Sequence, residues 1–277
     1  MVAGDGSRKS ADRGPADIRR DFVAIPKGEI HYAEAGAGSA VLLLHQTPRS
    51  WAEYHQVLPL LGARFRAIAM DTLGYGDSSK PPDADGDSVE GYAEAAVEFV
   101  ATLGLERVSL VGHHTGGVIA VEIAASRPEL VDRLVLSCTP AVDAIGRQVT
   151  HDVDDVEEAD DGSHLVELWR RRQGDYPPQR RDLLTAFMVD ALKAGPRAAG
   201  GHRAVQRYLM ETKLPLVKAR TLIIAAPRDP NYGDVERLRA GLRESEVIEI
   251  AAGTVPLPDH LPAEFSAAVT SFLGDDG

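Results

Sequence analysis

The chain has 277 residues, a formal net charge of −12 at pH 7 and 44% hydrophobic residues. This length suits one large α/β domain with a small insertion. The negative charge argues against nucleic acid or an anionic membrane as a partner, and no segment is long and apolar enough to span a bilayer. The single cysteine, Cys138, lies in an apolar run, so we expect it to be buried and to form no disulfide.

The first 20 residues contain no apolar segment, and we expect a flexible tail here rather than a signal peptide. After them, short apolar runs alternate with helical patterns, which is typical of a mostly parallel sheet covered by helices. The expected strands are 21–25, 29–35, 40–44, 65–70, 108–111, 133–137, 221–225 and 247–250. The expected helices around them are 50–61, 89–103, 115–126, 235–242 and 262–272.

No strand is expected between about residues 141 and 216. The acidic run 152–161 lacks the spacing of a calcium loop, so we interpret it as a solvated loop. Three helical patterns follow, at 164–173, 182–193 and 199–213, and we interpret the triple arginine 170–172 as a solvated helix face. We predict a helical cap over 141–216, inserted between core segments 21–140 and 217–277. At the carboxyl edge of the sheet it would cover the crevice where such sheets bind ligands.

The most informative motif is the sequence Gly-His-His-Thr-Gly at residues 112–116. It follows the apolar run 108–111 and precedes the helical run 118–125, so it predicts a strand, a tight turn and a helix. This is the layout of the G-x-S-x-G nucleophile elbow, with His114 at the position of the serine. His113, the residue before it, is expected to be structural.

Five motifs in the same order resemble the α/β-hydrolase superfamily, in particular its cap-bearing branch of epoxide hydrolases and haloperoxidases. They are Leu42–Pro48, Asp71–Pro81, the elbow, Leu134–Leu136 and Thr221–Pro230. The resemblance extends over about residues 21–273 and implies the α/β-hydrolase fold, with a mostly parallel eight-stranded sheet, flanking helices and a helical cap. In the second motif, we expect Asp71 to fix the glycine-containing loop 74–76. The fold alone does not determine the activity.

The resemblance also implies a triad of serine, histidine and acid, and two of its three positions are replaced. His114 stands at the serine position, and Val255 falls about where the family has its histidine. The acid position is retained as Asp229. Removal of the nucleophile or the base of a serine hydrolase costs on the order of 10⁶ in turnover, so ordinary serine esterase chemistry is not expected.

We expect His114 to act as the base or the nucleophile instead. It would sit at the amino end of a helix, where the helix dipole disfavours a positive charge, so the imidazole should be neutral at pH 7. Asp229 or Asp259 would orient its ring. His260 is a further catalytic candidate, and Asp143 is a weaker alternative acid.

The oxyanion loop and the cap supply the remaining candidates. The resemblance implies that the backbone N–H groups of Gln46 and Thr115 are the oxyanion donors and that His45 braces the loop at the pocket. Candidate pocket residues elsewhere are Trp169, His202, Tyr208 and Val255.

Three functions remain open. The first is a cofactor-independent enzyme acting on a small, largely apolar carbonyl, ester or lactone compound. The second is a lyase, isomerase or cyclase in the same pocket, and the third is an inactive binding protein, which the loss of the triad histidine would suit. The retained acid and glycines favour an enzyme. We expect a cytoplasmic protein without a metal, since His114, Asp259 and His260 lack a recognisable ligand spacing, and we leave a homodimer open.

Overall fold

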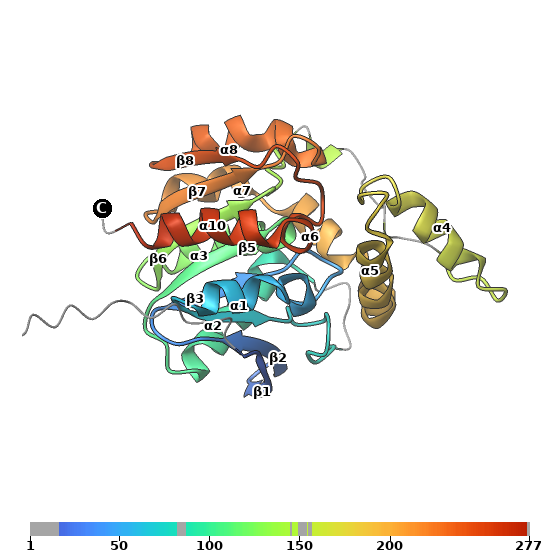
Figure 1. The fold of residues 1–277 in the computed structure, drawn as a ribbon, viewed down its shortest axis with the longest axis horizontal. Helices are drawn as coiled ribbons and strands as arrows, with labels where there is room; N and C mark the ends of the chain where they lie inside the picture. Colours follow the sequence, from blue (N-terminus) through green and yellow to red (C-terminus); the bar gives the residue numbers. More distant parts are fainter. Residues whose placement is uncertain (1–16, 82–86, 145, 149–153, 155–156, 276–277) are drawn as a thin grey trace, which may run out of the picture.

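The computed structural model describes residues 17–81, 87–144, 146–148, 154 and 157–275. Eight strands form one sheet in the order β1-β2-β4-β3-β5-β6-β7-β8 (Figure 1). Their bounds are β1 (Arg19–Ile25), β2 (Gly28–Ala35), β3 (Ala40–Leu44), β4 (Arg66–Met70), β5 (Val108–His113), β6 (Val131–Ser137), β7 (Arg220–Ala225) and β8 (Ser245–Glu249). β2 runs antiparallel to β1 and β4, and the other neighbours are parallel. The expected mostly parallel sheet of eight strands is confirmed.

The amino-terminal boundary differs from the expected one. β1 begins at Arg19, so Arg19 and Arg20 pair with β2 and do not belong to a tail. Residues 1–16 of the expected tail lie outside the described residues. No helix among the described residues is long and apolar enough to cross a membrane.

The centre of the sheet positions the site. β3 and β5 are buried along their whole length, because β3 is entirely apolar and β5 lies between two neighbours. The strand order reverses at β3, which has β4 on one side and β5 on the other. In parallel sheets a crevice opens at the carboxyl ends of the strands at such a point. Leu44 is in register with Gly112 and His113 with Ser137, so the loops that leave β3, β5 and β6 start side by side.

Helices cover both faces of the sheet. α1 (Val57–Gly62) and α10 (Pro262–Leu273) pack on one face, and α2 (Val89–Thr102) and α3 (Thr115–Ser126) pack on the other (Figure 1). α8 (Val235–Gly241) and the short α9 (Leu257–His260) complete this part of the chain. Short 3₁₀ turns occur at Trp51–Tyr54, Gly146–Gln148, Gly195–Arg197, Leu214–Leu216 and Pro230–Asp234.

The expected helix 50–61 is divided into the turn at Trp51–Tyr54 and α1. Pro59 explains the division, because in a continuous helix its ring would meet the carbonyl of His55 and it could donate no hydrogen bond. At the third position of a new helix neither problem arises.

Between β6 and β7 the chain forms α4 (Ser163–Arg172), α5 (Arg181–Ala194), α6 (Gly200–Arg207) and α7 (Met210–Lys213). α4 and α5 lie together beside the sheet layers, and their contact is filled by Leu168, Tyr176 and Phe187 (Figure 1). The expected helix 199–213 breaks at Tyr208, whose extended backbone lets its hydroxyl donate to Glu122 of α3 over 2.6 Å. Most of the acidic run 152–161 lies outside the described residues.

Asp71 fixes the loop that follows β4, as expected. Its side chain is fully buried and accepts hydrogen bonds from the backbone N–H groups of Trp51, over 2.6 Å, and Asp77, over 2.8 Å. His31 contacts the same carboxylate over 2.8 Å. Gly76 has φ +53, and a Cβ there would lie 2.2 Å from the carboxyl group of Asp71, so only glycine fits.

Close backbone contact between β3 and the turn after β5 generates a test of the fold. A Cβ at Gly116 would lie 2.0 Å from the carbonyl oxygen of Leu44, whereas a Cβ at Gly174 meets nothing within 4 Å. We expect Gly116→Ala to lower the free energy of unfolding by at least about 3 kcal/mol, since β3 and α3 must separate. Urea denaturation of this variant and of the control Gly174→Ala measures the difference. Equal stabilities of the two variants would contradict the described approach.

Candidate functional site

His114 occupies the sharp turn between β5 and α3. Its backbone angles are φ 48° and ψ −117°, an unusual conformation for a residue other than glycine, which costs on the order of 1–3 kcal/mol. The backbone enforces it: the N–H of His114 donates to Ser137 over 3.0 Å, and its carbonyl accepts from Gly117 over 2.9 Å. The side chain is thereby held at the carboxyl edge of the sheet.

The imidazole of His114 contacts a buried carboxylate directly. Its Nε2 lies 2.7 Å from Oδ2 of Asp229, which is 4% exposed and follows β7. The other oxygen of Asp229 accepts the backbone N–H of Asn231 over 2.8 Å. Burial raises the pKa of Asp229, but the adjacent His114 and these hydrogen bonds outweigh it, so the pKa lies below its ordinary value. Asp229 is therefore a carboxylate that can only accept, and Nε2 carries the proton.

Asn231 lies on the other ring nitrogen of His114. Its Nδ2 is 3.3 Å from Nδ1 of His114 and donates to the carbonyl of Cys138 over 2.9 Å. Because an amide NH₂ group only donates, the network assigns the Nδ1 lone pair to the side of Asn231. This 3.3 Å contact is long for a hydrogen bond, and both residues line the cavity described next. Asn231 was not predicted from the sequence, although it lies two residues after Asp229 and so in the loop expected to contain the acid.

A cavity of about 460 Å³ lies in front of His114. Its wall combines the turn at His114, the loops after β6 and β7, and parts of the helical segment between β6 and β7. The lining residues are His114, Thr115, Pro140, Ala141, Val142, Gly146, Arg172, Asp175, His202, Val205, Gln206, Pro230, Asn231, Asp234, Arg237 and Val255. The cavity is therefore apolar over much of its wall, with charged side chains from the insertion and from the segment after β7.

The structure separates the expected pocket residues into two groups. His202 and Val255 line the cavity, whereas Trp169, Tyr208 and His45 are not among its lining residues. Trp169 packs against the apolar contact of α4 and α5, and Tyr208 is buried against α3. Both side chains pack into apolar cores. On an amphipathic helix, a core position and a position that lines a pocket have the same spacing, so the sequence pattern did not distinguish them.

His45 braces the loop that follows β3. Its Nδ1 donates to the carbonyl of Gln46 over 2.7 Å, and its Nε2 accepts the N–H of Thr72 over 2.9 Å. Complete burial lowers the pKa of His45, which keeps the ring neutral and able to accept.

Gln46 has a different role from the expected one. Its backbone N–H donates to Oε2 of Glu53 over 3.0 Å, and its side-chain amide donates to Oε1 over 2.5 Å. Glu53 is fully buried, and a buried carboxylate requires such donors. The N–H expected to bind an oxyanion is thus occupied by the buried carboxyl group of Glu53. Thr115 lies at the turn as expected, and its hydroxyl contacts that of Thr47 over 2.9 Å.

Asp259 and His260 do not join the His114 ring. Asp259 accepts from Nη2 of Arg49 over 2.8 Å, and His260 contacts the hydroxyl of Thr254 over 3.1 Å. Arg49 is almost completely buried, with 1% of its surface exposed, and also donates from Nε to Asp190 of α5 over 2.9 Å. The need of a buried guanidinium for carboxylate partners explains the position of Asp259.

His113 is structural, as expected. Its Nε2 donates to the carbonyl of Val255 over 2.8 Å, and its Nδ1 accepts from Ser137 over 3.0 Å. Burial lowers the pKa of His113 to about 3, so the ring stays neutral. Cys138 is buried, as expected, and burial raises the pKa of its thiol. Although its sulfur lies near both histidines, a protonated thiol and an engaged His113 make a poor metal site.

Comparison with known proteins places this geometry in a family. Residues 39–189 match the family model described as the alpha/beta hydrolase fold. The chain belongs to the α/β-hydrolase family. It is similar to bifunctional epoxide hydrolase 2 of Rattus norvegicus, with 35% identity over 128 residues, 46% of this chain and 23% of that protein. It is also similar to a soluble epoxide hydrolase of a Corynebacterium species, with 39% identity over 107 residues, 39% of this chain and 37% of that one.

The match to solved structures covers more of the chain. A hydrolase from Pseudomonas aeruginosa PA01 aligns with a TM-score of 0.79 and 25% identity, over 92% of this chain and 98% of that one. The chain matches between 23% and 39% of the length of its curated relatives.

The buried Glu53 generates a prediction about pH. Burial raises its pKa to about 7, although Arg49 and Gln46 act in the opposite direction. In the unfolded chain the pKa is near its ordinary value of about 4.3, so folding takes up a proton between these two pH values. The stabilisation is complete below the unfolded pKa and is lost as the pH rises through 7, at up to about 1.4 kcal/mol per pH unit.

We expect the free energy of unfolding of the wild type to fall relative to Glu53→Gln between pH 5.5 and 8, because the amide does not titrate. Urea denaturation of both proteins across this range measures the change. A difference between the two that is independent of pH would show that Glu53 does not titrate in this range.

Proposed function

We propose that this protein is a cofactor-independent hydrolase in which the pair His114–Asp229 replaces the serine-based triad. The observation that carries the proposal is the 2.7 Å contact between Nε2 of His114 and Asp229 at the wall of a cavity of about 460 Å³. The acid of the triad here touches the turn residue itself. The imidazole thus stands at the family's nucleophile position. It also contacts the carboxylate that in the family orients the histidine base.

The ring can act in two ways. As a nucleophile, the lone pair on Nδ1 attacks the carbonyl carbon of an ester, and the C–O bond breaks. The departing oxygen takes a proton from solvent and leaves as an alcohol, and water then hydrolyses the acyl-imidazole to the acid and free His114. As a base, Nδ1 takes a proton from water while the hydroxide attacks the carbonyl carbon. The C–O bond then breaks, and the departing oxygen takes the proton back from His114 and leaves as an alcohol. In both forms the Asp229 carboxylate stabilises the positive charge that develops on the ring, as it does in a serine triad.

Oxyanion stabilisation requires a donor other than Gln46, because the N–H of that residue binds Glu53. We propose the backbone N–H of Thr115, at the start of α3, together with that of Thr47. The hydroxyl groups of these two threonines meet at 2.9 Å, and Thr115 is the residue that follows His114. The amino end of α3 adds favourable electrostatic potential for a negative oxygen.

The proposed substrate is a small, largely apolar ester, lactone or related carbonyl compound. Pro140, Ala141, Val142, Val205 and Val255 supply an apolar wall, and residues 141–216 are proposed to form the cap over it. The names of the relatives add epoxides to the compounds worth testing, since a base that activates water serves both reactions.

We expect His114→Ala to lower the hydrolysis rate of its best ester or lactone by at least about 10³-fold, because the reactive nitrogen is lost. Asp229→Asn should lower it by about 10²–10⁴-fold, because the amide neither fixes the tautomer nor stabilises the charged ring. A panel of activated esters, lactones and epoxides, assayed with wild type and both variants, measures these losses. His55→Ala is the control, since His55 is exposed and lies outside the cavity.

Equal rates for wild type and His114→Ala would contradict hydrolysis by this residue. Saturable binding of panel compounds without turnover would then indicate a binding protein. Rearranged or eliminated products that depend on His114 would indicate a lyase, isomerase or cyclase in the same cavity.

A further inference from the structure

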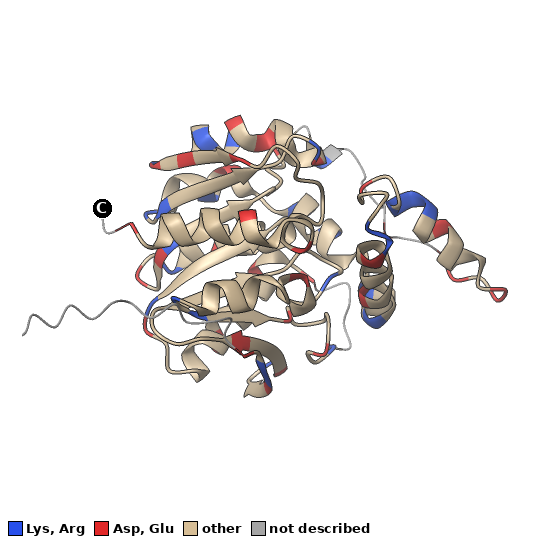
Figure 2. Cartoon of the chain, viewed as in Figure 1, with Lys and Arg blue, Asp and Glu red and all other residues tan. Residues whose placement is uncertain are grey.

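The helical segment between β6 and β7 brings an ion pair to the cavity that contains His114. Arg172, at the end of α4, and Asp175, in the loop leading to α5, both line this cavity. The triple arginine 170–172 was expected to be a solvated face, and Figure 2 shows it as the basic segment of α4. Arg170 and Arg171 are exposed, but Arg172 is only 7% exposed, so the expectation is wrong for this residue.

Arg172 holds Asp175 in a fixed place. The guanidinium carbon of Arg172 lies 4.8 Å over the ring of Phe187, and its Nε lies 3.1 Å from Asp154. Its Nη1 donates to Oδ2 of Asp175 over 3.1 Å, and the backbone N–H of Asp175 donates to the carbonyl of Arg172, also over 3.1 Å. Because the guanidinium is always charged, this contact favours the carboxylate form of Asp175.

One oxygen of Asp175 is open to a ligand. Oδ2 binds Arg172, but no residue in the described part of the chain donates a hydrogen bond to Oδ1, and the side chain is 34% exposed. The other two aspartates at the cavity have a partner on each oxygen. Both oxygens of Asp229 are engaged as described above, and those of Asp234 lie 2.8 Å from the N–H of Ala141 and 2.9 Å from Arg237. Asp175 is therefore the aspartate best placed to bind a ligand.

The two arginines of the cavity wall offer little to an anion, because each lies between two carboxylates. Arg237 lies 2.9 Å from Asp234 and 3.5 Å from Asp143, and Arg172 is flanked as described above. A histidine of the wall, such as His202, adds positive charge only when it is protonated. Among the described residues around the cavity, carboxylates thus outnumber arginines, which gives a negative electrostatic potential at alkaline pH.

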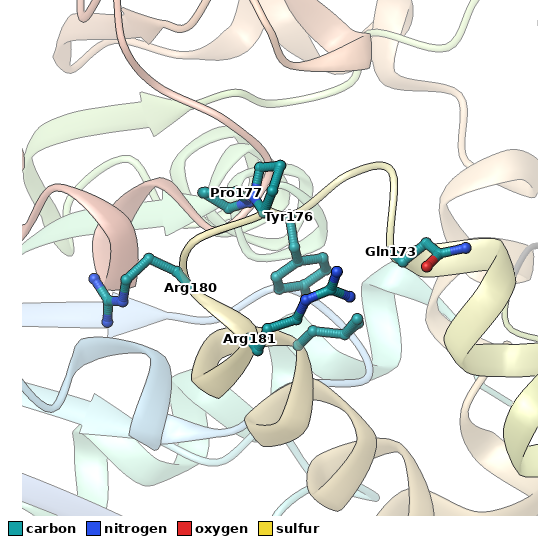
Figure 3. A pocket seen from close by; sticks show the side chains of 7 residues that line it. Gln173, Tyr176, Pro177, Arg180 and Arg181 are labelled. Carbon is teal, nitrogen blue, oxygen red and sulfur yellow. The ribbon is translucent and has the colours of Figure 1, made fainter.

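A second hollow, on the same connection between α4 and α5, has no comparable feature. It has about 70 Å³ and contains Tyr176, Arg180 and Arg181 (Figure 3). Arg180 points away from Tyr176 and pairs with Asp182 over 2.7 Å. This volume has room for a few water molecules, and none of these side chains points to a particular ligand. Asp182 lies outside the cavity of His114 and provides a matched control for Asp175.

We propose that Asp175 forms a subsite for a positively charged group and that the substrates are esters or lactones that carry an ammonium group. The inference deepens the proposed hydrolase function and rests on it for the reaction. The ammonium group lies against Oδ1 of Asp175, the apolar part of the wall accommodates the carbon chain, and the carbonyl group lies at His114. A negatively charged group finds no such partner, so anionic esters are bound less well.

Three compounds of similar shape test the subsite without turnover: choline, its neutral analogue 3,3-dimethylbutan-1-ol and the anion 3,3-dimethylbutanoate. NMR titrations at low salt and about pH 8, where histidine is ordinarily neutral, follow the side-chain amide of Asn231 in the cavity wall. We expect choline to bind the wild type about 5–10-fold more tightly than the neutral analogue, and the anion to bind more weakly than both.

Asp175→Asn keeps the shape of the side chain and removes its charge. We expect this variant to lower the preference for choline over the neutral analogue to less than about 2-fold. Asp182→Asn should keep the preference of the wild type, because Asp182 pairs with Arg180 outside the cavity.

Equal affinities of choline and the neutral analogue in the wild type would overturn the proposal, as would undetectable binding of choline. A preference that persists in Asp175→Asn would also overturn it, because the charge that selects the cation would then lie elsewhere. Tighter binding of the anion would show that the arginines determine the charge preference. None of these results depends on catalysis. A preference for choline that is lost in Asp175→Asn, together with inactivity toward every ester, would contradict the proposed function alone.

Discussion

The contact of His114 with Asp229 joins two segments that are separated by 115 residues and determines what the site can do. The strained turn after β5 presents the ring, and the loop after β7 presents the carboxylate, because both strands end at the same edge of the sheet. The carboxylate fixes the proton on one nitrogen and leaves the lone pair of the other beside Asn231. A serine hydrolase reaches this arrangement with three residues. Here the imidazole stands where the serine would be, and Val255 has only an apolar side chain and a carbonyl that braces His113.

A second constraint is the buried guanidinium of Arg49. It binds Asp190 of α5 and Asp259 of α9 and lies near Glu53, so it links the segment after β3 to α5 and to α9. Three carboxylates surround one cation, and burial raises the pKa of Asp259 as well as that of Glu53. The same network withdraws the N–H of Gln46 from the cavity. The position of α5 and the engagement of the Gln46 N–H therefore depend on one charged cluster.

The eight strands and the mostly parallel character of the sheet were predictable from the sequence, because buried parallel strands are short apolar runs and the glycines mark the turns. Asp229 was also predictable, since it follows a strand at the family position of the acid. The partners of Asp259, Gln46 and Arg172 were not, because each depends on which buried charge lies nearest in space. Sequence patterns indicate at which edge of the sheet a side chain lies. They do not show that Glu53 reaches Gln46 or that one of three arginines turns inward.

The account depends most on the proton of the His114 ring. Long-range ¹H–¹⁵N correlation NMR of the protein labelled in its histidines reports which ring nitrogen carries the proton in the neutral form. We predict a proton on Nε2 and an unprotonated Nδ1 in the wild type, and loss of this preference in Asp229→Asn. A proton on Nδ1 in the wild type would contradict the assignment and remove the lone pair on which the proposed chemistry rests.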